Sequence, residues 1–358
     1  MAMRLTYTFP LFCRLALAAF CLWAPWPVVA LTACNERDCA TNLMRGHIAT
    51  QPSYWKSRMQ RPLAQRIGAA PPELVEYVRL DNLGAGLASV PRAATLTPDF
   101  LRDVRRAFDE IPAPVKHLVG SRLAGIYLLE GLGSTGYTDT IFAADGKGVA
   151  GFIVLDAAVL KQRSANAWAT WKENTPFKPE PGFSLTASIA SPGQDNRRNA
   201  IQYILLHELG HIASIGADIH PHWGIAPNDV ERTDKLAYFK LSWTIARQEN
   251  RFISLFEPAF ETRREVVYYA EAKLRGSQMQ AVYTQLAATN FATLYAATSP
   301  GDDFAEAFAS YIHTVMMRKP LHIEIRHADR TLLKYSSCWT QARCADKRAL
   351  LEQLLHAK

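Results

Sequence analysis

The stretch Leu205-Leu206-His207-Glu208-Leu209-Gly210-His211 places a His-Glu-x-x-His motif inside an apolar run that extends from 201 to 215. On a helix, two histidines four residues apart lie on one face, one turn apart, so both imidazoles can reach a single metal ion. A zinc ion held by such ligands activates a bound water, and Glu208 beside it can accept the proton. The stretch therefore predicts a buried helix that carries a hydrolytic zinc site.

A third protein ligand is needed, and its spacing separates the classes of zinc peptidase. In the metzincin pattern a glycine follows three residues after the second histidine and a further histidine six residues after it. Ser214 and Ala217 occupy those two places here. The metzincin pattern is therefore excluded, and we interpret His220 and His222 as loop histidines.

Two acids with helical spacing occur downstream, in Pro300-Gly301-Asp302-Asp303-Phe304-Ala305-Glu306. Asp302 and Glu306 are one turn apart, so one can bind the metal while the other orients a histidine ligand. Either can be the third ligand, because Asp302 also stands where a helix N-cap would. Asp303 is expected to face solvent. His313 lies on the same helix face as Glu306 and is a further candidate.

The blocks 203–215 and 295–311 resemble the gluzincin metallopeptidases, and within them the catalytic domain of anthrax lethal factor and the Mlc titration factor peptidases. The third-ligand helix of that family carries Glu-Phe-Phe-Ala, often followed by Glu-Ala-Phe, and Asp302 to Phe308 is similar. The resemblance also implies that Tyr295, which stands in the place of a family tyrosine, supports the tetrahedral intermediate by donating to its oxyanion. The chain departs from the family at Asp302, one methylene shorter than the usual glutamate.

The expected fold class is α+β and zincin-like. It comprises a small, mostly antiparallel sheet and the active-site helix, followed by a mainly helical lower lobe. An edge strand of such a sheet can pair with an extended substrate. Residues 161–182, with prolines and two tryptophans, are expected to form a loop. We expect helices at 98–111, 199–215, 229–250, 258–289 with an interruption near Gly276, 302–317 and 347–356, and strands at 123–129, 138–143, 149–155 and 184–190.

The first 30 residues contain two arginines, no acidic residue and an apolar stretch too short and too proline-rich for a membrane span. This pattern indicates a signal peptide (1–30), which would precede an N-terminal lead-in (31–96) and the metallopeptidase domain (97–358). As an alternative, Leu31-Thr32-Ala33-Cys34 resembles a bacterial lipobox, which would make 1–33 the signal and place a lipid on Cys34.

The number of cysteines bears on the choice between a signal peptide at 1–30 and a lipoprotein signal at 1–33. Without the signal peptide the chain keeps Cys34, Cys39, Cys338 and Cys344, an even number that fits two disulfides in an oxidising compartment. The pairs can be local, 34 with 39 and 338 with 344, or crossed between the two ends. Because lipidation of Cys34 would leave one thiol unpaired, we favour a periplasmic or secreted protein over one anchored to the bacterial envelope.

The formal net charge is +7, with both signs interspersed along the chain. No basic run and no basic patch with interleaved aromatic residues is present, so the sequence does not indicate a nucleic-acid partner. We expect a peptide or protein substrate, and membrane contact only if Cys34 is lipidated; the sequence makes no prediction of oligomeric state. The alternative function is a catalytically impaired zincin-like envelope protein that binds a peptide or a cell-wall component, and the departure at Asp302 keeps this alternative open.

Overall fold

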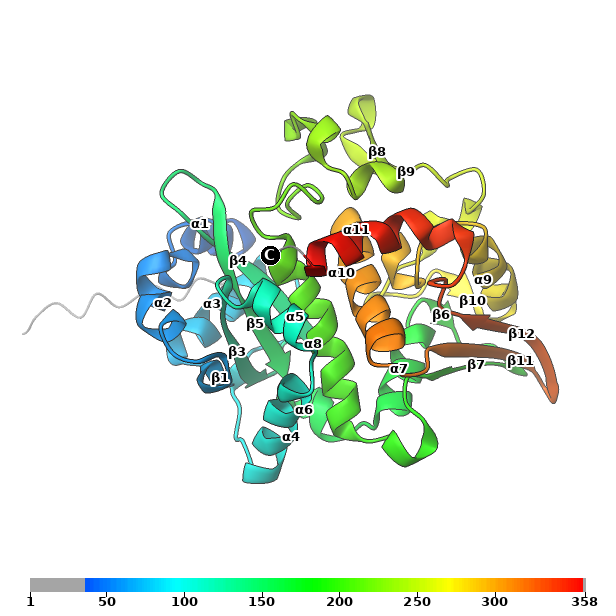
Figure 1. Cartoon of the computed structure of the whole chain (residues 1–358), viewed down its shortest axis with the longest axis horizontal. Helices are drawn as coiled ribbons and strands as arrows, with labels where there is room; N and C mark the ends of the chain where they lie inside the picture. The colour runs from blue at the N-terminus through cyan, green and yellow to red at the C-terminus, as the bar shows by residue number, and fades with distance from the viewer. Residues whose placement is uncertain (1–35, 357–358) are drawn as a thin grey trace, which may run out of the picture. The chain divides into compact units, whose positions relative to one another are not determined.

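In the computed structural model, which describes residues 36–356, a mixed sheet lies against the helix that carries the motif (Figure 1). The sheet path is β1-β3-β5-β4, and β2 pairs with the end of β3. Its strands are β1 (Ile67–Ala69), β2 (Arg92–Ala93), β3 (Leu123–Glu130), β4 (Gly136–Phe142) and β5 (Gly148–Asp156).

The pairing differs from the mostly antiparallel sheet that we expected. β1 and β5 both run parallel to β3, whereas β4 is antiparallel to β5 and β2 is antiparallel to β3. The reason is that β4 does not pair with the strand before it. It forms a hairpin with β5 around Asp145-Gly146, a pair typical of hairpin turns, so β3 and β5 lie side by side in the same direction and β4 is left at the edge.

Helix α8 (Arg197–Ser214) carries the motif and confirms the predicted helix. The side chain of Asn196 caps its first turn by accepting from the Asn199 amide, and the chain turns away at Gly216, whose φ is +66°. Almost all of its residues are buried, as expected of a helix that is apolar around most of its circumference. Helices α4 (Pro98–Asp109), α5 (Ala113–Val119), α6 (Ala157–Lys161) and α7 (Ala165–Asn174) surround it.

Helix α10 (Pro300–Tyr311), which continues as a π-helical turn (Ile312–Met316), packs closely on α8. Gly210 lies at the contact, where an added Cβ would come within 2.8 Å of the Cα of Ala305. The glycine inside the motif therefore permits the two helices to approach at backbone distance, which brings their functional side chains together.

The N-terminal lead-in forms part of the same unit, Asn35–Lys358. It supplies β1 and β2, and its helices cover the sheet (Figure 1). A second apolar core, which includes Trp55, Tyr77 and Phe152, lies there. Trp55 is fully buried, with its ring stacked at 5.2 Å on that of Phe152. The helices are α1 (Arg37–Arg45), α2 (Pro52–Met59) and α3 (Pro72–Ala85).

Asp81 of α3 makes the free energy of unfolding depend on pH. Burial raises the pKa of its carboxyl to about 6, and the negative charge of Asp139 adds to the effect. Because the folded state holds the proton more tightly than the unfolded chain, the free energy of unfolding should fall as the pH rises from about 4 to about 6. Asp81→Asn should therefore stabilise the protein by about 1–2 kcal/mol at pH 7.5 but not at pH 4, as measured by urea unfolding. An equal effect at both pH values would contradict this.

The region after α8 is less helical than expected. The helix predicted at 229–250 is wrong, because the region contains short 3-10 turns and a hairpin. The helix predicted at 258–289 is confirmed only beyond the expected interruption near Gly276, as α9 (Met279–Ala287). The apolar residues with helical spacing belong to separate turns that pack on the core, and Asn250, with φ +46°, forms the tight turn of the hairpin. The hairpin consists of β8 (Trp243–Ala246) and β9 (Arg251–Ser254).

Two further small sheets join strands that precede α8 to strands that follow it (Figure 1). The strand expected at 184–190 is β7 (Phe183–Ser188), which pairs antiparallel with β11 (His322–His327), and β11 pairs with β12 (Arg330–Ser336). β6 (Phe177–Lys178) pairs parallel with β10 (Leu274–Arg275). The loop predicted at 161–182 is wrong, because Ser164 caps α7 and the three prolines of this segment all follow the end of the helix.

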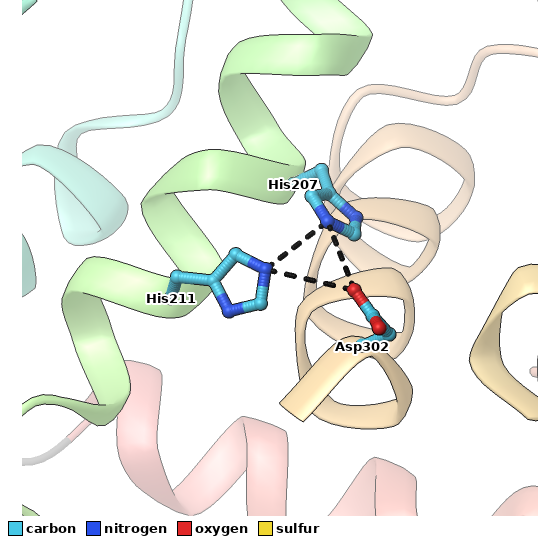
Figure 2. Close-up of side chains that lie close together, drawn as sticks. All are labelled: His207, His211 and Asp302. Atoms are coloured by element: carbon cyan, nitrogen blue, oxygen red, sulfur yellow. Dashed lines mark hydrogen bonds and ion pairs between the residues drawn. The ribbon is translucent and has the colours of Figure 1, made fainter. Parts of the chain in front are cut away.

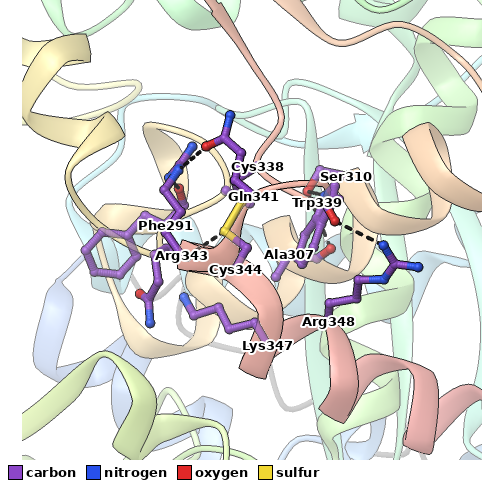
Figure 3. The surroundings of a disulfide bond; sticks show 12 residues. Phe291, Ala307, Ser310, Cys338, Trp339, Gln341, Arg343, Cys344, Lys347 and Arg348 are labelled. Carbon is purple, nitrogen blue, oxygen red and sulfur yellow. Dashed lines mark hydrogen bonds between the residues drawn. A yellow bond between two sulfur atoms is a disulfide. The ribbon is translucent and has the colours of Figure 1, made fainter.

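The chain ends in α11 (Ala345–His356), as predicted, and the disulfide Cys338–Cys344 lies just before it (Figure 3). The local pairing is thus confirmed for these two cysteines. Cys34, the signal peptide and the lipobox lie outside the described residues. Within residues 36–356, no helix has the length and apolar character that a membrane span requires.

Candidate metal centre

His207 and His211 of α8 and Asp302 of α10 point toward one another (Figure 2). The two Nε2 atoms are 3.2 Å apart, and Oδ1 of Asp302 lies 3.8 Å from Nε2 of His207 and 3.9 Å from Nε2 of His211. Within residues 36–356 this is the group of histidine, cysteine and acidic side chains found close enough together to hold a metal ion.

These separations fit a zinc ion. A circle through three atoms 3.2, 3.8 and 3.9 Å apart has a radius of about 2.1 Å, which equals Zn–N and Zn–O bond lengths of ~2.0–2.2 Å. Two imidazoles and one carboxylate are also a common donor set for catalytic zinc. Burial holds the pKa of His211 well below its ordinary value, which favours the neutral imidazole that a metal requires.

Glu306 lies behind His207, on the side away from the three converging atoms. Its Oε1 accepts from His207 Nδ1 at 3.0 Å, and because a carboxylate only accepts, this bond places the ring proton on Nδ1 and leaves Nε2 free. Of the two acids that the sequence offered as third ligand, the structure brings Asp302 to the shared point and gives Glu306 this orienting contact.

Lys172 of α7 is a member of this site that the sequence did not indicate. Its buried Nζ donates to Glu306 Oε1 at 3.0 Å and lies 3.5 Å from Glu173. Burial raises the pKa of Glu306, but the charge of Lys172 and the bond from His207 outweigh it, so the pKa stays below its ordinary value. Glu306 therefore remains a carboxylate and a strong acceptor for His207. No local pattern marks Lys172, because it lies more than a hundred residues from its partner.

Asp302 is oriented by the start of its own helix. Ser299, not Asp302, is the N-cap, since its hydroxyl oxygen accepts from the Asp302 amide. The same hydroxyl donates to Asp302 Oδ2 at 2.7 Å, which leaves Oδ1 to face the histidines.

Glu208 is held by the edge strand β4. Thr138 Oγ1 donates to Glu208 Oε2 at 2.6 Å, and an added Cβ at Gly136 would lie 2.5 Å from Oε1. Burial raises the pKa of Glu208, which brings the carboxylate closer to the basicity that a proton acceptor near neutral pH needs. We did not predict Gly136 and Thr138 as site residues. Their only sequence signal is the presence of small and polar residues at alternate strand positions.

Tyr295 lies in a single turn (Tyr295–Ala297) before α10. Its ring stacks on that of His207 at 5.5 Å, and Lys172 Nζ lies 4.8 Å from its centroid. Tyr295, His207 and Glu208 line the same small cavity. Burial raises the pKa of the phenol well above its ordinary value, so it remains a hydrogen-bond donor.

The other candidate histidines have different contacts. His313 is buried and its Nε2 lies 2.9 Å and 3.0 Å from the carbonyl oxygens of Ile189 and Pro320, so it lies away from the three converging atoms. His220 and His222 belong to the segment that follows α8, as expected of loop histidines. His220 Nδ1 donates to the Pro221 carbonyl oxygen, and His222 Nε2 lies 2.8 Å from Thr140 Oγ1 on β4.

Asp303 is fully buried, and the expectation that it faces solvent was wrong. Lys347 of α11 donates to both of its carboxylate oxygens, at 2.5 and 2.8 Å, and the indole of Trp243 donates at 3.0 Å. Both partners lie more than 40 residues away in the chain, so the sequence around Asp303 gives no sign of them.

Comparisons with protein-family models, with curated proteins and with solved structures find no match to this chain. The arguments for a function therefore come from the arrangement of these side chains.

Proposed function

We propose that the protein is an exported zinc metallopeptidase with a zincin-like fold of the gluzincin class. The observation that carries this proposal is the convergence of the His207, His211 and Asp302 donor atoms beside the buried carboxylate of Glu208. When bound, zinc supplies a Lewis acid and an activated water. The gluzincin assignment rests further on the order of the elements, in which a sheet with an edge strand precedes α8 and the helix of the third ligand follows.

The short side chain of Asp302 is compatible with this function. Relative to glutamate it lacks one methylene, but Gly210 lets α10 approach α8 at backbone distance. Oδ1 is then within 4 Å of both histidine nitrogens without a longer side chain. The close helix packing therefore offsets the departure on which the alternative function, a catalytically impaired peptide-binding or wall-binding protein, depends.

The other steps of peptide-bond hydrolysis are assigned to side chains of the protein. Glu208 accepts the proton of the attacking water and passes it to the leaving amine, with Thr138 fixing the orientation of the carboxylate. Tyr295 donates a hydrogen bond to the oxyanion that develops on the scissile carbonyl. Glu306 and Lys172 keep His207 in the tautomer that leaves Nε2 available.

One structural feature supports an extracytoplasmic location. The disulfide Cys338–Cys344 fits an oxidising compartment. We propose that the protein is periplasmic or secreted, with a lipid anchor at Cys34 as the alternative.

The proposal is tested by metal analysis of the purified protein and by peptide-library cleavage with and without a chelator. We expect one zinc per chain and cleavage that the chelator abolishes and added zinc restores. A protein purified without stoichiometric zinc, with no cleavage after zinc is added, would favour the binding-protein alternative.

The two acids of α10 should behave differently when zinc affinity is measured by competition with a chromophoric chelator. Asp302→Ala removes a ligand and should abolish stoichiometric binding. Glu306→Gln removes only the support of His207 and should weaken binding by about 10–100-fold. Asp329→Ala, which changes an exposed acid, serves as the control. The reverse order, with Glu306→Gln the more damaging, would make Glu306 the ligand.

A further inference from the structure

The edge strand β4 runs alongside the candidate metal centre. Among residues 36–356 it pairs with β5 on one side only, and three of its alternate residues contact α8 or the segment that follows α8. Gly136 and Thr138 contact Glu208, and Thr140 contacts His222. An extended peptide that pairs with this edge would therefore pass over Glu208. The two ends of β4 differ in the space that they offer to the side chains of such a peptide.

At the Gly136 end lies a small cavity of about 40 Å³. Its walls beyond Gly136 include Trp168, Lys172, Tyr269 and Tyr295, together with the site residue His207. A cavity that accepts a benzene ring has about 150 Å³, whereas one water needs roughly 10–15 Å³. The space therefore admits a small side chain, such as a methyl or hydroxymethyl group, but not an aromatic ring.

The walls of the small cavity are fixed by their own contacts. Lys172 is held between Glu306 and Glu173, the indole of Trp168 donates to Thr135 Oγ1, and the ring of Tyr295 stacks on His207. Because moving Lys172 would leave buried carboxylates without a counter-charge, the cavity does not widen at low cost.

At the Phe142 end lies a groove of about 520 Å³, more than ten times larger. Trp223 forms the wall nearest the metal site: its ring is 5.3 Å from that of His211 and stacks at 4.4 Å on His222. This indole is 37 % exposed, and Val149 in the same groove is 44 % exposed. An exposed indole thus lies open beside the candidate ligands, in a groove whose lining also includes charged residues such as Glu231 and Arg232.

The direction of a bound peptide follows from strand pairing. Antiparallel pairs are both more frequent and slightly more stable per residue than parallel pairs. Because β4 runs from Gly136 to Phe142, an antiparallel peptide has its N-terminal part at the groove and its C-terminal part at the small cavity.

We propose, resting on the peptidase function above, that the substrates have an aromatic or bulky apolar residue directly before the scissile bond and a small residue directly after it. The groove beside Trp223 binds the first residue, and the cavity bounded by Lys172 and Tyr269 limits the second. Selectivity therefore comes from a large subsite on the N-terminal side and a restricted subsite on the C-terminal side.

Two peptides of identical composition test this, one with a central Phe-Ala and the other with a central Ala-Phe. Wild-type protein should cleave the Phe-Ala bond with a kcat/KM at least about 10-fold higher than the Ala-Phe bond, with the cut located by mass spectrometry. In a fluorescence-anisotropy titration, the Glu208→Gln protein should bind the Phe-Ala peptide at least about 10-fold more tightly than the Ala-Phe peptide.

Three variants link the preference to the named residues. Trp223→Ala should reduce the preference and Trp223→Phe should largely retain it. Tyr269→Gly should widen the cavity and raise cleavage of the Ala-Phe bond; the φ of Tyr269 is +59°, which glycine adopts freely. Leu255→Ala, which changes an exposed apolar residue that lines neither space, should leave the ratio unchanged.

The outcomes separate this inference from the peptidase function. Cleavage without preference, or with Ala-Phe preferred, would overturn the inference and leave the function standing. Selective binding of the Phe-Ala peptide without cleavage would support the subsites and count against the function. If neither peptide is bound or cleaved, both are overturned.

Discussion

Glu208→Gln should reduce peptide hydrolysis by about 10²–10⁴-fold while zinc remains bound. Glutamine keeps the shape of the side chain and can still accept from Thr138 Oγ1, but it cannot take a proton from water. The measurement is kcat/KM on a cleaved peptide, together with zinc content and thermal unfolding of the same preparation. A loss of activity that accompanies loss of zinc would instead indicate a damaged site.

Thr138→Val is the matched control, because it removes the hydrogen bond that orients Glu208 but leaves the carboxylate in place. The loss of one such bond is worth about 1–2 kcal/mol, so kcat should fall by roughly 10-fold rather than by orders of magnitude. Thr138→Ser, which keeps the hydroxyl, should recover most of the activity. Unchanged hydrolysis in Glu208→Gln would rule out Glu208 as the proton acceptor.

The parts of the site that the sequence predicts are those encoded by local spacing. His207 and His211 share a face of α8 because they are four residues apart, and Asp302 and Glu306 share a face of α10 for the same reason. The spacing could not assign roles to the two acids. That distinction depends on how closely α8 and α10 pack, which Gly210 decides.

The contacts that the sequence did not predict are distant in the chain. Lys172 reaches Glu306, Thr138 reaches Glu208 and Lys347 reaches Asp303, and in each case a polar residue is buried because its partner arrives from another element. The secondary structure was also predicted only in part. Helices α4, α8, α10 and α11 were predicted close to their observed bounds, whereas α7 was missed despite its Ser164 cap. Most of 229–289 was misassigned because apolar spacing alone does not distinguish a helix from a series of turns on the core.

Lys347→Ala should lower the free energy of unfolding by about 3–5 kcal/mol, the largest stability effect that we expect. The Lys347–Asp303 pair is fully buried, between α11 and α10. Figure 3 shows Lys347 close to the disulfide Cys338–Cys344. Burial raises the pKa of Asp303 and lowers that of Lys347, so each charge is tolerated only because the other is present. Removing the lysine leaves a buried carboxylate without a counter-charge, directly beside Asp302. The measurement is urea unfolding at pH 7.5.

The exposed pair Arg348–Glu352 on the same helix gives the control, because Arg348→Ala should cost no more than about 0.5 kcal/mol. The double variant Lys347→Met with Asp303→Asn should recover much of the loss, since no buried charge remains. A Lys347→Ala protein within about 1 kcal/mol of the wild type would mean that Asp303 is already neutral or reached by water. If the large loss is found, α11 stabilises the fold next to the candidate site, because its Lys347 neutralises the acid that follows the candidate ligand Asp302.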